Sequence, residues 1–289
     1  MTDDLSELLF NGLNEQGYLF QEACAQALLK NSRRTGWELP VWDYSVALPG
    51  GPNRRIDIVL SRPQQNGLEA FAIIECKRAN PDYAFWMFAA PDRGMPEEFH
   101  GVILPRVGTS YLAAMPFKSY FEMGAAVPIS WMEVRRDRRS NQRSSVPQTI
   151  EDAVAQVLLG TTGLAIEQFN QRTKAGMNSN QVMFFPVIVT TARLFVANYN
   201  TDDIDLESGT ITREKVAFGD GSLPEEERWV LINYPEGEST ALAGIPDTLH
   251  STNPADLDRY KIRSVYVVNA NHLLAFFQRL NRNIPVLAP

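Results

Sequence analysis

RRIDIVL (residues 54–60) and AIIECKRA (residues 72–79) are the two stretches of sequence that decide the expected fold. Both are apolar runs of strand length, and both carry charge. Asp57 lies in the middle of the first run, and Glu75 and Lys77 lie near the end of the second. Burying an unpaired charge is costly, so a charge within such a segment needs a partner or a function. The three charged residues therefore call for a common explanation.

The turn cluster PQQNG (63–67) separates the two stretches and predicts an antiparallel hairpin. With the shortest closure of this turn, Arg62 pairs with Leu68. Counting back along both strands then places Asp57 opposite Ile73. Because cross-strand partners share a face of the sheet, the side chain of Asp57 is expected on the face that Ile73 occupies.

Glu75 and Lys77 belong to the same face, because side chains two residues apart on a strand point the same way. The expected register makes Asp57 and Glu75 diagonal neighbours, about 7–8 Å apart at the backbone. A slip of one residue would move Asp57 to the opposite face and separate the charges. The sequence thus predicts a cluster of two carboxylates and one amine, provided that the hairpin register holds.

The remaining hydrophobic patterns predict a mixed α/β protein. The expected elements are a helix at 15–31, strands at 41–48, 55–62 and 68–79, a helix at 149–171, two strands within 182–199, a strand at 228–234, and a strand, turn and helix within 264–280. We expect one elaborated domain over 1–289, with a core at 15–79 and 148–199, an insertion at 80–147 and a C-terminal extension at 200–289.

Composition excludes several classes of protein. The net charge of -7 argues against general coating of nucleic acid, although it allows a local basic groove. No apolar run approaches the length needed to cross a bilayer, and the acidic N-terminus does not resemble a secretory signal. Two cysteines and three histidines argue against a zinc cluster. We therefore expect a cytoplasmic, disulfide-free protein that does not enter a membrane.

The carboxylates of Asp57 and Glu75 would form a hard oxygen site suited to Mg²⁺ or Mn²⁺. Lys77 beside them could orient a water molecule or balance charge on a phosphate oxygen. This combination suits in-line attack on a phosphodiester. The alternative is purely structural: Asp57 and Glu75 could form ion pairs with Arg55 and Lys77.

A helix, three strands, an aspartate within the second strand and Glu75-Cys76-Lys77 ending the third together resemble the PD-(D/E)XK nuclease superfamily, whose fold is restriction-endonuclease-like. The resemblance implies an αβββαβ core. It also implies that Asp57, Glu75 and the Cys76 main-chain carbonyl bind the metal, and that Lys77 is the catalytic lysine. Ile56 stands where the motif's name places proline, which is a departure from the pattern.

Two further residues are candidates through the same resemblance. Many members of the superfamily carry an acidic residue on the first helix, where Glu22 lies. Some carry a glutamine on the second core helix, where Gln156 lies. The alternatives are a solvated helix carboxylate for Glu22 and an ordinary polar-face residue for Gln156.

Nucleic acid would need positive charge near the site. The candidates are Arg54, Arg55 and Arg78 beside the strands, and Arg135, Arg136, Arg138, Arg139 and Arg143 in the loop RRDRRSNQR. Surface salt bridges and a solvated loop are the structural alternatives. We interpret the aromatic run Tyr83, Phe85, Trp86 and Phe88 as core or an oligomer contact rather than as a platform for stacking bases.

The sequence therefore predicts a metal-dependent endonuclease with DNA as the favoured substrate. Restriction or anti-phage defence is the setting that family analogy implies. A catalytically silent module that binds nucleic acid or a partner protein is one alternative, and an RNA-cleaving enzyme is another. Cleavage of both strands by a protein with one site would require a homodimer.

Overall fold

The computed structural model describes residues 2–15, 17–48, 52–65, 68–91, 95–104, 115–120, 122–134, 149–175, 181–219, 223–235 and 262–284. Its helices are α1 (Thr2–Glu15), α2 (Tyr18–Lys30), α3 (Ser32–Thr35), α4 (Thr149–Ala175) and α6 (Leu273–Asn283). Its strands are β1 (Glu38–Val46), β2 (Arg54–Gln65), β3 (Leu68–Lys77), β4 (Phe85–Pro91), β5 (Glu98–Leu104), β6 (Met115–Tyr120), β7 (Ser130–Val134), β8 (Gln181–Thr190), β9 (Arg193–Tyr199), β10 (Val216–Ala217), β11 (Trp229–Pro235) and β12 (Ile262–Asn269). The expected mixed α/β class is confirmed.

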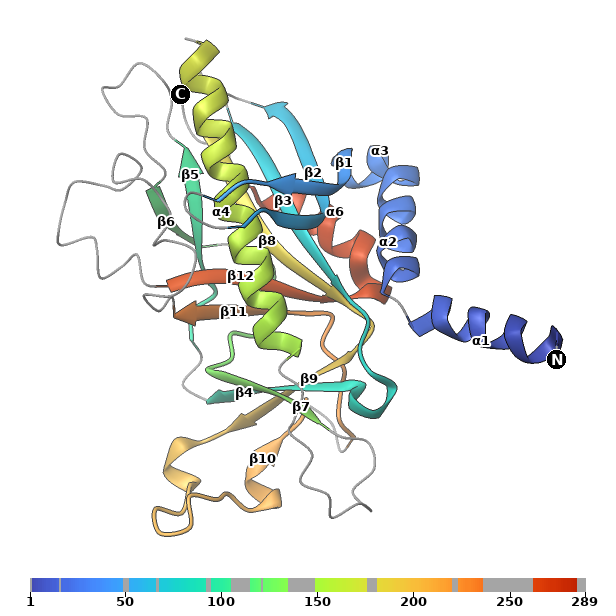
Figure 1. Ribbon diagram of the computed structural model, residues 1–289. Coiled ribbons are helices and arrows are strands. Elements are labelled where there is room, and N and C mark those ends of the chain that lie inside the picture. Colours follow the sequence, from blue (N-terminus) through green and yellow to red (C-terminus); the bar gives the residue numbers. More distant parts are fainter. Residues whose placement is uncertain are drawn as a thin grey trace.

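The larger sheet has the strand order β1-β2-β3-β8-β12-β11; β5 also pairs with β8, and β6 pairs with β5 (Figure 1). Strands β1, β2 and β3 form an antiparallel meander. Strand β8 then pairs parallel to β3 over their whole length, and β12 pairs parallel to β8. The continuously apolar sequence of β3 fits its central place, because helices cover both of its faces.

A smaller sheet has the order β10-β9-β4-β7. It takes β4 and β7 from the predicted insertion at 80–147. Strand β9 follows β8 after a two-residue junction, as expected, but it pairs with β4 and leaves the larger sheet. Trp86 and Phe88 on β4 are fully buried, which confirms the interpretation of this aromatic run as core.

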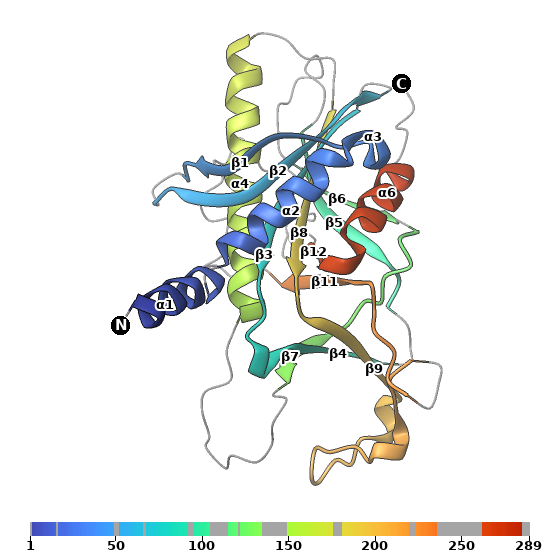
Figure 2. The ribbon, with the colours of Figure 1, turned by 90° about the vertical axis from the view of Figure 1, so that its right-hand side faces the viewer.

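The helices lie on opposite faces of the larger sheet (Figures 1 and 2). Helix α4 packs on one face, where Val154 and Val157 meet apolar side chains of β2, β3 and the smaller sheet. Helices α2 and α6 pack on the other face through residues such as Leu28 and Phe276. A Cβ at Gly163 would lie 2.5 Å from a Val46 methyl group, so glycine lets α4 approach β1 closely.

The hairpin register differs from the expected one by two residues. Strand β2 continues past Pro63 to Gln65, with an irregularity after Arg62, so Arg62 pairs with Ala70 instead of Leu68. A shift of two residues preserves the face on which each side chain lies. The last pair of the ladder is Ile58 with Ile74, so Asp57 and Glu75 are next along it and lie directly opposite rather than diagonal.

The predicted helix at 15–31 corresponds to α2, and α1 precedes it as a helix that was not predicted. Helix α1 ends at Glu15, and α2 begins at Tyr18 with Gly17 as its N-cap. Helix α1 extends away from the sheets in both views (Figures 1 and 2) and exposes leucines such as Leu8, which is 66% exposed. None of the described helices has both the length and the apolar character needed to cross a membrane.

Candidate active site

Asp57 is held at the end of the β2–β3 ladder by two hydrogen bonds from different elements. Its Oδ2 accepts a bond of 2.7 Å from the main-chain N–H of Cys76 on β3. Its main-chain carbonyl accepts a bond of 3.1 Å from Nε2 of Gln21 on α2. Strand and helix therefore both fix the position of this carboxylate.

Glu75, Lys77 and Gln156 form a second chain of contacts at the same strand end. The Nζ of Lys77 lies 2.7 Å from Oε1 of Glu75, and it donates to Oε1 of Gln156 at 2.7 Å. Gln156 reaches the strand from the first half of α4. The structure thus brings together the Glu75–Lys77 ion pair that the structural alternative expects and the contact with Gln156 that the catalytic hypothesis expects.

The site carries more buried negative charge than it balances. Glu75 is 7% exposed, and burial, assisted by the charge of Asp57, raises its pKa to about 7. Burial likewise raises the pKa of Asp57, although the hydrogen bond from Cys76 and the charge of Lys77 oppose that shift. Two carboxylates that are costly to ionise beside one amine form a site that a further cation would stabilise.

A cavity of about 290 Å³ opens beside these carboxylates, lined by Asn53, Arg54, Arg55, Asp57, Glu75 and Gln156. The Nε of Arg54 is buried there and has no hydrogen-bond partner among the described residues. A buried donor without a partner is unfavourable, and the guanidinium would have to turn toward the cavity before an anion there could accept from this Nε.

Arg55 lies at the border of this cavity but does not pair with Asp57, contrary to the structural alternative. It forms an ion pair with Asp43 on β1 and donates to the hydroxyl of Tyr18 at 3.2 Å. Asp43 itself has a φ of 56°, in the left-handed region that non-glycine residues rarely adopt. The Asp43–Arg55 pair therefore holds one guanidinium at the edge of the cavity.

The donor set suits a magnesium-like ion, although it supplies few ligands. No group of three or more His, Cys, Asp or Glu side chains placed to hold a metal occurs in the described part of the chain. Mg²⁺, however, is commonly bound by one or two carboxylates, with water and substrate phosphate completing its shell. Asp57 and Glu75 fit that pattern. The Cys76 carbonyl as a third ligand stays a prediction.

The other candidates from the sequence lie elsewhere. Glu22 is exposed, accepts a hydrogen bond from Gln26 on its own helix and does not line the cavity. Arg78 is exposed and does not line it either. The loop arginines Arg135, Arg136, Arg138, Arg139 and Arg143 lie outside the described residues.

Sequence reasoning missed Gln21, which is the side chain of α2 that contacts the strand of Asp57. The sequence of α2 does contain a pattern that identifies Gln21. Gln21 is spaced from Cys24, Ala25 and Leu28 as the members of one helix face are, and all four side chains are buried. A polar residue in the buried stripe of a helix needs a hydrogen-bond partner, and that partner is the strand carrying Asp57.

Comparison of the chain with family models, with curated proteins and with solved structures found no match. The resemblance to PD-(D/E)XK nucleases therefore stays a prediction. It is carried by Asp57, Glu75 and Lys77 and by the elements on which they lie.

Proposed function

We propose that this chain is a nuclease that depends on a divalent metal and hydrolyses phosphodiester bonds, with DNA as its favoured substrate. The observation that carries the proposal is the convergence of Asp57, Glu75 and Lys77 at one strand end, beside a cavity whose wall includes two arginines. An isolated structural ion pair needs neither a second buried carboxylate nor a cavity.

Each side chain has a distinct task in the proposed reaction. Asp57 and Glu75 would hold Mg²⁺ or Mn²⁺, which when bound polarises the phosphate and makes a coordinated water more acidic. Lys77 has three N–H donors, and Glu75 and Gln156 engage two of them in the described contacts. A third N–H remains to orient the attacking water or to donate to a phosphate oxygen. Gln156 sets the direction of the Lys77 side chain.

The order of the elements supports the same proposal. Helix α2 is followed by the antiparallel strands β1, β2 and β3, then, after the intervening segment, by α4 and by β8, which runs parallel to β3. This is the αβββαβ order that the resemblance implies. The proposed carboxylates come from β2 and β3, and the proposed glutamine comes from α4.

Arg54 and Arg55 would bind phosphates of the substrate. The Nε of Arg54 is buried without a hydrogen-bond partner among the described residues, and a phosphate oxygen is a strong acceptor for a guanidinium. Arg55 at the cavity border would contact a neighbouring phosphate. Local contacts of this kind allow a protein of net charge -7 to bind nucleic acid.

A cleavage assay tests the proposal. The purified chain is incubated with supercoiled plasmid, with single-stranded and double-stranded DNA oligonucleotides, and with RNA, in Mg²⁺, Mn²⁺ or EDTA. We expect metal-dependent products from DNA that disappear in EDTA and in Asp57→Asn. Products only from RNA would transfer the proposal to RNA.

Binding without cleavage in every metal would contradict it and favour the silent module. The resemblance also implies restriction or anti-phage defence and a homodimer, and both stay predictions.

A further inference from the structure

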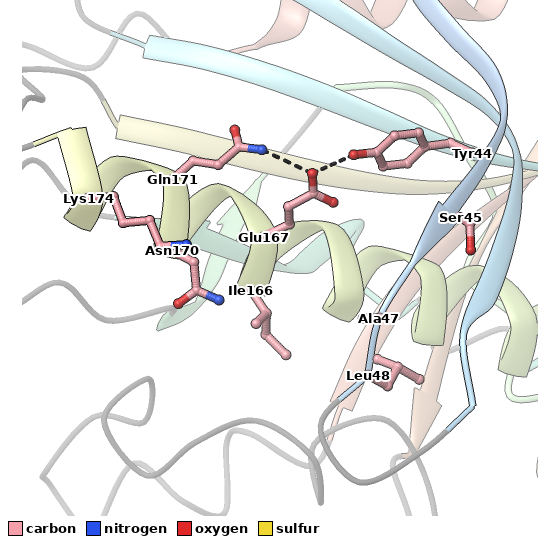
Figure 3. A pocket seen from close by; sticks show the side chains of 9 residues that line it. All are labelled: Tyr44, Ser45, Ala47, Leu48, Ile166, Glu167, Asn170, Gln171 and Lys174. Carbon is pink, nitrogen blue, oxygen red and sulfur yellow. Dashed lines mark hydrogen bonds between the residues drawn. The ribbon is translucent and has the colours of Figure 1, made fainter.

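We propose that a second cavity, between the end of β1 and the second half of α4, binds a nucleobase that carries an exocyclic amino group. This groove has a volume of about 590 Å³ and is lined by Tyr44, Ser45, Ala47, Leu48, Ile166, Glu167, Asn170, Gln171 and Lys174 (Figure 3). The choice of a nucleobase as the ligand rests on the proposed nuclease function. The chemistry of the groove selects which base.

Glu167 is the central polar group of the groove, and it is held in one orientation. Its Oε1 accepts hydrogen bonds from the hydroxyl of Tyr44 and from Nε2 of Gln171, the latter at 3.0 Å (Figure 3). The hydrogen bond to Glu167 raises the pKa of Tyr44 to about 12, so this hydroxyl remains a donor at neutral pH. In the described part of the chain, both hydrogen bonds to the carboxylate end on Oε1, so Oε2 is left for a ligand.

A fixed carboxylate oxygen selects a hydrogen-bond donor. Among nucleic-acid groups, phosphates and carbonyls are acceptors, whereas the exocyclic amino groups of cytosine, adenine and guanine are donors. Uracil and thymine offer a ring N3–H, but two carbonyl oxygens flank it and a carboxylate repels them. The negative charge of Glu167 also repels a phosphate from the middle of the groove. The ligand at this position is therefore a base edge with an amino group, and uracil and thymine are disfavoured.

The other lining residues complete a base-sized site. The aliphatic side chains of Leu48 and Ile166 offer apolar contact for the face of a base. Asn170 has an amide that both donates and accepts, so it can meet the acceptor that stands beside an amino group on each of these bases. Lys174, at the end of the row, is placed for the phosphate attached to the bound nucleotide.

The groove stands at a defined distance from the candidate active site. Gln156 and Glu167 lie on the same helix, eleven residues apart, which corresponds to about 16 Å along its axis. Steps of 3.4 Å along a stacked strand make this roughly five nucleotides. Strand β1 supplies the wall opposite α4 at the groove, and its neighbour β2 supplies that wall at the cavity. A strand bound at the cavity could thus insert a base from a neighbouring position into the groove.

Direct binding measurements separate this inference from the proposed function. Fluorescently labelled oligomers of deoxycytidine and of deoxyuridine, each about 12 nucleotides long, differ at one edge of the base. Cytosine has an amino group and a ring acceptor where uracil has a carbonyl and a ring N–H. Titration with the full chain in EDTA measures binding without cleavage. We expect deoxycytidine to bind about tenfold more tightly than deoxyuridine, as one added hydrogen bond to a charged acceptor predicts.

Two variants and one control assign the preference to the groove. Glu167→Gln should reduce the ratio of the deoxycytidine affinity to the deoxyuridine affinity to near one. Asn170→Ala should lower this ratio several-fold, and it leaves the hydrogen bond between Tyr44 and Glu167 in place. Asp152→Asn changes an exposed residue on the first turn of the same helix and should leave the ratio unchanged. Thermal melting of each variant verifies its fold.

Equal affinities for the two oligomers in the unmodified protein would overturn the inference, as would an unchanged ratio in both groove variants. A parallel cleavage assay in Mg²⁺ judges the proposed function by itself. Cleavage without a base preference would refute only the groove, whereas a base preference without cleavage would refute only the nuclease.

Discussion

Strand β3 carries a glutamate near each end; Glu69 pairs with α4 directly, whereas Glu75 is linked to α4 through Lys77. At the start of the strand, Glu69 pairs with Arg172 at 3.1 Å. At its end, Glu75 pairs with Lys77 at 2.7 Å. The Glu69 side chain is 30% exposed and that of Glu75 is 9% exposed. The less exposed glutamate is thus the one that pairs with a lysine, a point charge, rather than with an arginine.

The balance of charge distinguishes the two ends. Glu69 faces a guanidinium that a single carboxylate matches, and this pair ties β3 to α4. Glu75 shares one lysine with Asp57, beside a cavity. An ion pair that exists for structure is complete in itself, whereas a site for chemistry leaves acceptors that only a metal or a substrate can satisfy. Four predictions test this distinction, beginning with the largest effect.

Lys77→Ala should give the largest effect of the four substitutions, because it changes the end of β3 that carries the proposed active site. Because the lysine is the proposed donor to water or phosphate, we expect the cleavage rate to fall by about 10²- to 10⁴-fold. Lys215→Ala, which removes an exposed lysine paired with Asp203, is the control and should cleave normally. Initial rates on a labelled DNA duplex in Mg²⁺ measure the effect. An unchanged rate in Lys77→Ala would remove the lysine from the mechanism.

Glu75→Gln should stabilise the metal-free protein at high pH. The folded-state pKa of Glu75, about 7, lies above its ordinary value of 4.5, so ionisation destabilises the folded state increasingly between these two pH values. Relative to the original protein, the variant should gain up to about 3 kcal/mol in the free energy of unfolding between pH 4.5 and pH 8. Urea denaturation in EDTA at several pH values measures it. A pH-independent difference would show that Glu75 does not titrate as described.

Glu69→Gln should have the opposite pattern, because it breaks a structural pair. The substitution leaves the buried guanidinium of Arg172 without its carboxylate, and we expect a loss of about 2 kcal/mol in the free energy of unfolding. Cleavage measured well below the melting temperature should be unaffected. If this variant lost activity as fully as Lys77→Ala, the distinction between the two ends would be wrong.

Gln21→Leu should give the smallest effect, and it tests whether Gln21 belongs to the proposed active site. It removes the hydrogen bond to the Asp57 carbonyl, at a cost of about 1 kcal/mol in stability. Because this bond positions the strand that carries the proposed metal ligand Asp57, the variant should also need more Mg²⁺ for half-maximal cleavage. Glu22→Gln, on the neighbouring exposed position, should change neither quantity. A Mg²⁺ titration of both variants compares them.

Local sequence patterns predicted the part of the fold that surrounds the site. The apolar run of β3 and the turn before it place Asp57 and Glu75 on one face, even though the register differs by two residues. The difference arises because β2 continues through Pro63, which a rule that treats proline as a strand terminator does not anticipate. A register shift of two residues keeps Asp57 on the predicted face of the sheet, whereas a shift of one residue would have moved it to the opposite face.

Long-range contacts were beyond such reasoning. Strand β9 reads as a continuation of the β8 pattern, but its partner β4 lies about a hundred residues away in the chain, and no local periodicity encodes that pairing. Similarly, Glu22 and Gln21 are adjacent on a helix, and only the packing direction of α2 determines which of them meets β2. The groove beside Glu167 depends on how closely α4 approaches β1, which the glycines of α4 permit.

The left-handed conformation of Asp43 has a consequence for how this protein can change. A residue with a side chain stores of order 1 kcal/mol of strain at such a backbone position, and glycine would relieve it. Glycine would also remove the carboxylate that pairs with Arg55. At this point of β1, stability and the proposed contact of Arg55 with phosphate make opposite demands on a single residue. A lineage selected for heat resistance alone would therefore tend to lose that proposed contact.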